Sequence, residues 1–567
     1  MITEEGDGPG DAPGAASDSA PGRIAAVLPG VRRGLPDAAL LTAVVAVGTL
    51  VHPIGEQLDR PYWRDETWVA ALARAPFGSI GGLNGSTPTG FMALVKFVPD
   101  SWPQGGRLVA LAFTALGVAA AYVLVRRLAW PSATIARAAA TAAGLVVGLA
   151  PATVQRNDLK QYTADACCAL VLLIVADAVD RERPPYAVWW LGLALLAVFP
   201  FSTVAVFTGF AVFVGIGVRR LVARDLIGFA YAFGTGVGAG GLVLWWLAAV
   251  VLPAQPESLR DYWAPAYLHG SFGDVMTTVW SRLDAVSPRI GLAPLLAIAL
   301  LAAGVVVLAR LGSVAVAIAV PVLVVEMIVL GATDRYPFLD VRTSHFLFIV
   351  VLVTATIGVA GAVAALAHRR RALAIIVGVV VLGAYAAQAR PYAGKLWIWD
   401  EDTRGQTEAV AGALRPGDVV VVGRGADYGF AYYWPAGRLD FRTADGPTGF
   451  RVRVRDVPAL YAPDRTPDAL ADTMVDAVGL WRAAPDGARI FVVRSHLARG
   501  EDRIWSDVFA ALGVRPRRLD VGREPLLVIG PPGPGEPGSP RVAPRPRPEP
   551  KAGATATLGV PDRRSLP

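Results

Sequence analysis

Long apolar runs alternate with short polar segments over the first two thirds of the chain. The apolar runs lie near 38–54, 106–125, 134–152, 163–180, 186–201, 202–218, 228–252, 291–309, 313–331, 345–366 and 372–389. Most approach the ~20 residues that an α-helix needs to cross the hydrocarbon core of a bilayer. The pattern therefore predicts a polytopic α-helical membrane domain over residues 36–399, with about eleven transmembrane helices.

The pattern changes near residue 400. Apolar runs shorten to strand length at 418–423, 488–494 and 525–530, and helical periodicity appears at 467–484 and 505–513. Such alternation is typical of an α/β domain with a largely buried sheet. We therefore expect a second domain of this class over residues 400–530.

Composition supports the membrane assignment and excludes other classes. The 567 residues are 54% hydrophobic and 17% charged, with a mean hydropathy of +0.46, which a soluble fold does not accommodate. The net charge of +7 is dispersed, so nucleic acid is not an expected partner. The leader, residues 1–35, and the Pro-rich tail, residues 531–567, are predicted to be disordered. Cys167 and Cys168 are adjacent in an apolar run and are expected to be packing residues.

Basic residues set the expected topology. Arginines occupy every second gap between the apolar runs, including the gaps at 32–33, 126–127, 181–183, 219–224 and 368–371. The positive-inside rule places these gaps and the leader in the cytosol. The remaining gaps and, after eleven spans, the α/β domain are then extracytoplasmic. The sequence thus predicts a multi-pass protein of the plasma membrane, with a cytosolic N-terminus and with polar clusters gathered on the outer face.

The first polar cluster, residues 62–67, follows the first apolar run and contains Asp65 beside Glu66. A charge at bilayer depth costs about 2.5–3.5 kcal/mol, so such groups are retained where they meet water, a substrate or a partner charge. Asp65 and Glu66 are therefore the first candidates for function. The alternative is that Asp65 only caps the amphipathic segment 67–77.

The second polar cluster, residues 155–165, leads into the apolar run at 163–180. A helix that begins near Asn157 would place Asp158, Tyr162 and Asp165 on one face. Asp165 lies within the apolar run, so it requires a partner inside the bundle. The basic residues of the cluster, Arg156 and Lys160, either extend to lipid headgroups or bind an anionic ligand.

Several short strings resemble the GT-C superfamily of polytopic glycosyltransferases. The resemblance is to bacterial family 39 members akin to protein O-mannosyltransferases and lipid A aminoarabinose transferases, and it covers roughly residues 36–400. It rests on Tyr62-Trp63-Arg64-Asp65-Glu66, Ser86-Thr87-Pro88-Thr89-Gly90, Gly106-Arg107-Leu108, Leu159-Lys160-Gln161-Tyr162-Thr163-Ala164-Asp165, and Tyr336-Pro337-Phe338 followed by Arg342. The family often has Pro-Pro-Leu where this chain has Thr87-Pro88-Thr89.

The resemblance implies transfer of a sugar from a polyprenyl-phosphate donor to an envelope acceptor (a glycan, lipid or protein) on the outer face of the bilayer, with inversion at the anomeric carbon. Asp65 matches the family's proposed base. Glu66 would raise the pKa of Asp65 or help it to hold a divalent cation, the one cofactor considered. The expected donor-phosphate ligands are Lys160, Arg107, Arg342 and Arg335. The expected substrate contacts are Tyr62, Arg64, Tyr162, Asp158 and Asp165.

Two other classes of function fit a many-helix membrane protein. A transporter or flippase of a lipid-linked or envelope precursor would show repeated halves with broken helices in matching positions, and the sequence shows no such repeat. A non-catalytic envelope scaffold would not require Asp65, Glu66, Lys160 and Asp165 together.

Overall fold

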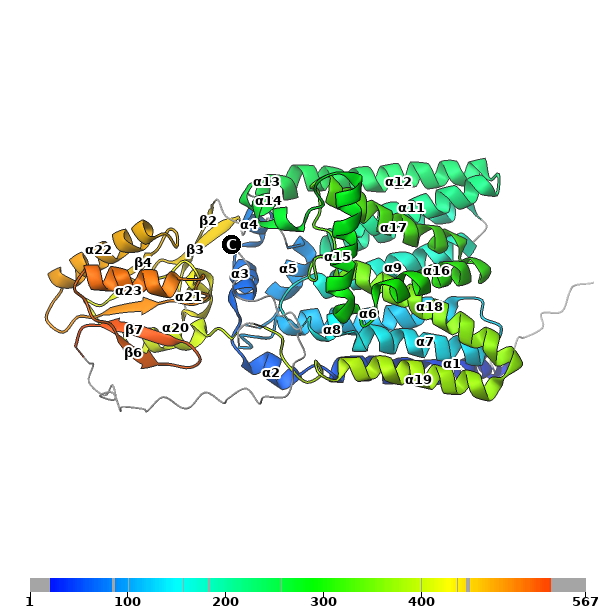
Figure 1. The fold of residues 1–567 in the computed structure, drawn as a ribbon, viewed down its shortest axis with the longest axis horizontal. Coiled ribbons are helices and arrows are strands. Elements are labelled where there is room, and N and C mark those ends of the chain that lie inside the picture. Colours follow the sequence, from blue (N-terminus) through cyan, green and yellow to red (C-terminus); the bar gives the residue numbers. More distant parts are fainter. Residues whose placement is uncertain are drawn as a thin grey trace, which may run out of the picture.

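The computed structural model describes residues 21–531, except 84–86, 100, 157, 182–183, 256, 399, 436 and 445–448. A bundle of long helices occupies one end of the molecule, and an α/β domain occupies the other (Figure 1). Residues 1–20 of the expected leader and 532–567 of the expected tail lie outside the described residues. The first helix begins at Pro21, so residues 21–35 of the expected leader are helical, contrary to the prediction.

The long helices of the bundle run mostly along the long axis of the molecule, and short helices gather at the end beside the α/β domain (Figure 1). The long helices are α1 (Pro21–Leu50), α6 (Arg107–Arg127), α7 (Ala133–Leu149), α9 (Tyr162–Arg181), α10 (Val188–Val198), α11 (Ala205–Val222), α12 (Leu226–Trp246), α15 (Phe272–Ile290), α16 (Pro294–Arg310), α17 (Val314–Ala332), α18 (His345–Arg369) and α19 (Arg371–Ala389). The short helices are α2 (Ile54–Asp59), α3 (Arg64–Ala73), α4 (Phe77–Leu83), α5 (Thr89–Lys96), α8 (Pro151–Val154), α13 (Leu252–Ala254) and α14 (Glu257–Trp263).

Each predicted apolar run falls largely on a helix. Within the described residues, seven helices are long and apolar enough to cross a membrane, and an eighth crossing results if α15 and α16, bent by 80°, form one span. The apolar helices at Leu35–Leu50, Ala133–Leu149 and Pro185–Phe201 are shorter. The polytopic helical fold is therefore confirmed, whereas the count of eleven crossings stays a prediction.

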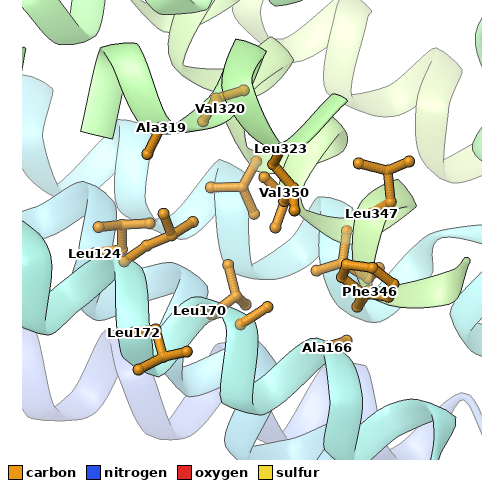
Figure 2. Close-up of a cluster of buried hydrophobic side chains, with 14 of the residues drawn as sticks. Leu124, Ala166, Leu170, Leu172, Ala319, Val320, Leu323, Phe346, Leu347 and Val350 are labelled. Carbon is orange, nitrogen blue, oxygen red and sulfur yellow. The ribbon is translucent and has the colours of Figure 1, made fainter. Parts of the chain in front are cut away.

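The core of the bundle is formed by aliphatic side chains from helices distant in sequence. Figure 2 shows Leu170 of α9, Leu323 of α17 and Val350 of α18 within one buried cluster. Small residues bring other helix pairs closer still. A Cβ at Gly304 of α16 would lie 1.9 Å from the carbonyl oxygen of Thr354 in α18. Such backbone approach is a usual source of helix association in membranes, where apolar burial alone gives little preference.

The α/β domain is built on a five-stranded sheet of order β4-β1-β5-β7-β6, with β4, β1 and β5 parallel and β7 antiparallel to both of its neighbours. A separate antiparallel pair is formed by β2 and β3. The strands are β1 (Val419–Val422), β2 (Leu439–Thr443), β3 (Phe450–Val454), β4 (Ala459–Tyr461), β5 (Ile490–Val493), β6 (Arg517–Asp520) and β7 (Pro525–Ile529). The helices are α20 (Thr403–Ala413), α21 (Asp427–Tyr433), α22 (Pro467–Ala483) and α23 (Glu501–Ala511).

The predicted fold class of this domain is confirmed. The three predicted strands are β1, β5 and β7; every residue of β1 and β5 is buried, as expected of central strands. The helix predicted at 505–513 begins earlier, at Glu501, because Gly500 supplies a left-handed φ of 83° immediately before it. The strands β2, β3, β4 and β6 were not predicted, because β2, β3 and β6 contain arginines and β4 has only three residues, so none of them forms a continuous apolar run.

Aromatic residues of α21 attach the α/β domain to α3. The Tyr433 hydroxyl accepts a hydrogen bond from the Tyr62 amide at 2.8 Å, and the Tyr432 hydroxyl donates to the Pro103 carbonyl at 2.6 Å. The rings of Tyr62 and Tyr432 lie 5.7 Å apart. The polar segment that precedes α3 is therefore enclosed between the two domains.

The contact between α16 and α18 makes a prediction. Gly304→Ala should destabilise the bundle by about 1–3 kcal/mol, because the added methyl group overlaps the Thr354 backbone and the helices must separate. Gly383→Ala in α19 is the matched control, since its Cβ would meet no atom within 4 Å. Thermal unfolding of both variants in detergent would test this, and an equal response of the two would contradict the packing described.

Candidate active site

The candidate site is built around the first turn of α3. Trp63 precedes the helix in an extended conformation, and Asp65 and Glu66 lie in the first turn, where negative charge complements the helix dipole. The Glu66 carboxylate accepts a hydrogen bond from the Trp63 amide at 3.2 Å. Capping of this helix is therefore carried by Glu66, whereas Asp65, which the alternative interpretation made a cap, is partly exposed with a side-chain accessibility of 19%.

Glu66 and Arg107 form a fully buried ion pair. The Arg107 Nε and Nη2 atoms donate to the two Glu66 carboxylate oxygens at 2.7 and 2.5 Å. The guanidinium also donates to the carbonyl oxygens of Gln57, Arg60 and Pro61. Glu66 in addition accepts from the Leu159 amide at 2.8 Å. This pair connects α2, α3, α6 and the segment before α9.

These contacts correct the expected roles of Glu66, Arg107 and Tyr62. The first two are saturated by each other and by the backbone, so neither has capacity left for a catalytic proton or a donor phosphate. Tyr62 is buried, and its hydroxyl accepts a hydrogen bond from the Gly106 amide at 3.0 Å, so this group is engaged within the protein. Glu66 is occupied by Arg107, and no group of three metal-ligating acids, histidines or cysteines occurs in the part of the chain that the structure describes, so the divalent cation stays a prediction.

Three charged groups from separate segments, Asp65, Lys160 and Arg342, lie close together near the first turn of α3. Asp65 forms an ion pair with Arg342, whose Nη1 atom lies 3.2 Å from its Oδ2. Lys160 is buried beside them, with its ammonium group 3.5 Å from the centre of the Trp68 ring. The structure thus brings together Asp65, Lys160 and Arg342, which sequence analysis had placed in one site.

The electrostatics of these groups are mutually dependent. Burial tends to raise the pKa of Asp65, but Lys160, Arg342 and Arg64 outweigh it and hold the pKa below the ordinary value. Burial lowers the pKa of Lys160 to about 8, against the opposing effect of Asp65 and Asp158. Asp65 is therefore ionised at neutral pH, and Lys160 is close to its titration point.

The second polar cluster differs from the expected helix. α9 begins at Tyr162, so Asp158 lies in the preceding loop rather than one turn below Tyr162 on a helical face. Asp158 is nevertheless buried, with its carboxylate 3.9 Å from Arg156. Asp165 is buried, and its Oδ1 atom and the Ser202 hydroxyl have no hydrogen-bond partner among the described residues, so the interior partner that its depth requires stays a prediction. Asn157 lies outside the described residues, as does Ser86 of the other string.

The remaining expected site residues, Tyr162, Arg64 and Arg335, lie in different surroundings. Tyr162 is buried and faces the guanidinium of Arg156, 5.8 Å from its ring centre. Arg64 is half-buried at the start of α3, where its amide donates to Glu401 of the α/β domain at 2.8 Å. Arg335 is exposed and forms no ion pair among the described residues, so the structure does not bring this expected phosphate ligand into the cluster.

Sequence analysis missed several residues that border the cluster. The Arg342 Nη2 atom donates to the Tyr262 hydroxyl at 2.9 Å, and the guanidinium lies 5.5 Å from the Trp263 ring centre. From the α/β domain, His496 donates to or accepts from Glu401 at 2.6 Å, and its ring lies 6.4 Å from that of Trp63. The aromatic pair Tyr262-Trp263 at the end of α14 was a usable signal, whereas the placement of His496 depends on how the two domains dock.

Comparison with known proteins identifies the fold. No protein-family model matches the chain, and no curated protein matches it in sequence. The oligosaccharyltransferase of Archaeoglobus fulgidus, in a complex with zinc and sulfate, matches with a TM-score of 0.50 at 10% identity, over 80% of this chain and 67% of that chain. ArnT from Cupriavidus metallidurans in the apo state gives a TM-score of 0.47 at 15% identity, over 88% of this chain and 98% of that chain. The chain therefore shares its overall fold with this oligosaccharyltransferase.

The buried ion pair makes a prediction about stability. Glu66→Ala should destabilise the protein by about 3–5 kcal/mol, because it leaves the Arg107 charge buried without its partner. Asp65→Ala, one residue earlier but partly exposed, should change stability by less than about 1 kcal/mol. Thermal unfolding of the two purified variants would separate the roles. If Asp65→Ala proved as destabilising as Glu66→Ala, Asp65 would belong to the same structural pair.

Proposed function

We propose that the chain is a glycosyltransferase that moves a sugar from a polyprenyl-phosphate donor to an acceptor of the cell envelope. The observation that carries the proposal is the convergence of Asp65, Lys160 and Arg342 at the end of the bundle that faces the α/β domain. A carboxylate beside two cations is the minimum set for removing an acceptor proton and stabilising a phosphate leaving group. The fold that the chain shares with an archaeal oligosaccharyltransferase also supports the proposal, because its membrane helices suit a lipid-linked substrate.

The donor phosphate is proposed to bind Lys160 and Arg342. Arg342 is anchored by Asp65 and Tyr262, and it lies near enough to Lys160 for the two positive charges to interact. An apolar pocket between α5 and α12, lined by Pro88, Phe199 and Trp246 among others, is proposed to hold part of the prenyl chain. A hydrocarbon tail bound in this pocket would remove its own apolar surface and that of the pocket from water, which favours binding.

Asp65 is proposed to act as the base. In the ligand-free state its two cationic neighbours hold its pKa low, which makes it a weak proton acceptor. A phosphate bound to Lys160 and Arg342 would share their charge, and the pKa of Asp65 would then rise toward a value suited to accepting a hydroxyl proton. Donor binding would thereby activate the base, and a single displacement would invert the anomeric carbon.

The site is proposed to face the outside of the plasma membrane. Basic side chains gather at the opposite end of the bundle, where Arg126 and Arg137 pair with Asp37, and Arg219 pairs with Asp180. By the positive-inside rule that end is cytosolic, which leaves the N-terminus in the cytosol and makes the α/β domain extracytoplasmic. An envelope glycan, lipid or protein would then reach Asp65 from outside.

A transporter of a lipid-linked precursor is less well supported. Transporters built from repeats use broken helices in matching positions of both halves. One bent pair, α15 and α16, occurs among the described helices, and it has no counterpart there.

The role of Asp65 is tested by Asp65→Asn, which preserves shape and removes the base. Transfer should fall by about 10²–10⁴-fold, the usual contribution of a positioned base. The sugar content of the envelope, measured in a deletion strain that expresses the variant, provides the readout, with purified protein checked for undecaprenyl phosphate binding by native mass spectrometry. Asp59→Asn, an exposed carboxylate nearby, is the control. Wild-type transfer by Asp65→Asn would remove the basis of the proposal.

The pKa of Lys160 predicts a pH dependence. Lysine is positive below its pKa, which is about 8 here, so affinity for undecaprenyl phosphate should decline as the pH rises from 7 to 9. The phosphate itself stays dianionic over this range, because its second pKa is about 6. In Lys160→Arg the charge persists and the decline should disappear. An identical pH profile in wild type and Lys160→Arg would assign the dependence to another group.

A further inference from the structure

The α/β domain presents one edge of its sheet to α3. The parallel strands β4, β1 and β5 end in the loops that carry Arg465, Arg424 and His496, respectively. From β1 the chain passes to β4 on one side, and from β5 it passes toward β6 and β7 on the other. The crevice outside the carboxyl ends of β1 and β5 is therefore a topological switch point, the place where open α/β sheets bind ligands.

The loops at this edge are packed closely together and against the start of α3. A Cβ at Gly425 would lie 2.1 Å from the Ser495 carbonyl oxygen and 3.0 Å from Nη2 of Arg465, so only glycine fits there. Glu401 joins the edge to α3, since it binds both the Arg64 amide and the His496 imidazole. His496 itself has a left-handed φ of 50°, a conformation that a non-glycine residue holds at a cost.

Three guanidinium groups, those of Arg64, Arg424 and Arg465, lie near one another at this edge, and two of them have acidic partners. Arg424 pairs with Asp427, and the Arg465 Nε atom lies 3.6 Å from Glu501. No carboxylate pairs with the Arg64 side chain among the described residues. The Nε atom of Arg64 and the Nη2 atom of Arg465 are buried and have no hydrogen-bond partner in the same part of the chain.

The like charges are close enough to affect one another. Burial lowers the pKa of Arg465, and Arg64 and Arg424 lower it further. A purely structural interface would gain from fewer cations here, whereas a site for an anion requires them. Phosphate is the group that planar guanidinium donors match best, through paired charge-assisted hydrogen bonds.

We propose that Arg64, Arg424 and Arg465 form an anion site that binds a phosphate group of the acceptor. The inference rests on the proposed function, and it specifies the acceptor as a phosphate-bearing molecule. Arg64 is adjacent to Asp65 in the chain, so an anchored phosphate would hold a neighbouring hydroxyl of the acceptor near the base. The site is separate from Lys160 and Arg342, which meet the donor.

The test uses the full chain and inorganic phosphate as the probe. The protein carries Lys160→Gln and Arg342→Gln as a background, so that the proposed donor site does not contribute to binding. Phosphate should raise the Tm in this background, and adding Arg465→Gln should weaken the apparent Kd at least about tenfold, as expected for loss of a charge-assisted hydrogen bond. Arg503→Gln is the control, because it removes the same charge from a side chain of α23 that is 87% exposed.

Arg64→Gln, a substitution in the membrane domain, should weaken phosphate binding to the same extent. It allows the proposal to be tested even if Arg465→Gln fails to fold. A second arm compares nanodiscs of zwitterionic lipid with and without phosphatidic acid. An Arg465-dependent rise in Tm with phosphatidic acid alone would identify a lipid-borne phosphate, and a rise with inorganic phosphate would show recognition of the group itself. The proposal is overturned if neither probe raises the Tm, or if both raise it equally in Arg465→Gln and Arg64→Gln.

The same proteins separate this inference from the proposed function. Binding of undecaprenyl phosphate should be lost in Lys160→Gln and kept in Arg465→Gln. Loss in Lys160→Gln without any arginine-dependent phosphate binding would overturn the acceptor site alone. Binding of undecaprenyl phosphate that depends on Arg465 and not on Lys160 would overturn the proposed division between donor and acceptor sites.

Discussion

The buried ion pair between Glu66 and Arg107 is the interaction on which the rest of the site depends. It holds the end of α2, the start of α3, the start of α6 and the loop before α9 at one point. Successive residues on a helix point about 100° apart, so burying Glu66 directs its neighbour Asp65 toward the space beneath the α/β domain. Of the two adjacent carboxylates, Glu66 therefore holds the elements of the site together, and Asp65 projects into the site.

The Glu66–Arg107 pair also supports the charged cluster of Asp65, Lys160 and Arg342. Lys160 is held in a buried position by a loop whose Leu159 amide binds Glu66, and its charge is supported there by Asp65 and Asp158. Arg342 arrives from a distant loop and balances Asp65. Each charge in the cluster shifts the pKa of its neighbours, so a bound phosphate would affect all three groups rather than the one that it contacts.

Much of this arrangement could be predicted from the sequence. Apolar runs located the helices of the bundle and the central strands β1, β5 and β7, because burial on all sides leaves a continuous apolar signal. The grouping of Asp65, Lys160 and Arg342 followed from the family resemblance. The separate roles of Asp65 and Glu66 could not be predicted, since adjacent carboxylates look alike until a distant guanidinium selects one. The contacts of Glu401 and His496 depend on how two domains meet, for which a single sequence carries no local pattern.

The tyrosines of α21 have a consequence for how substrates arrive. Through Tyr432 and Tyr433 the α/β domain is fastened to α3 and to the loop before α6, the same elements that carry the site. The α/β domain is therefore held in a fixed position over the site, because separating it from the bundle would expose buried aromatic rings and break hydrogen bonds to the backbone. Access to Asp65 is then favoured from the sides, which in the proposed orientation means from within the plane of the outer leaflet. If the proposed transfer takes place there, its substrates would arrive by diffusion in two dimensions, and bulk water, a competing acceptor, would be kept at a distance.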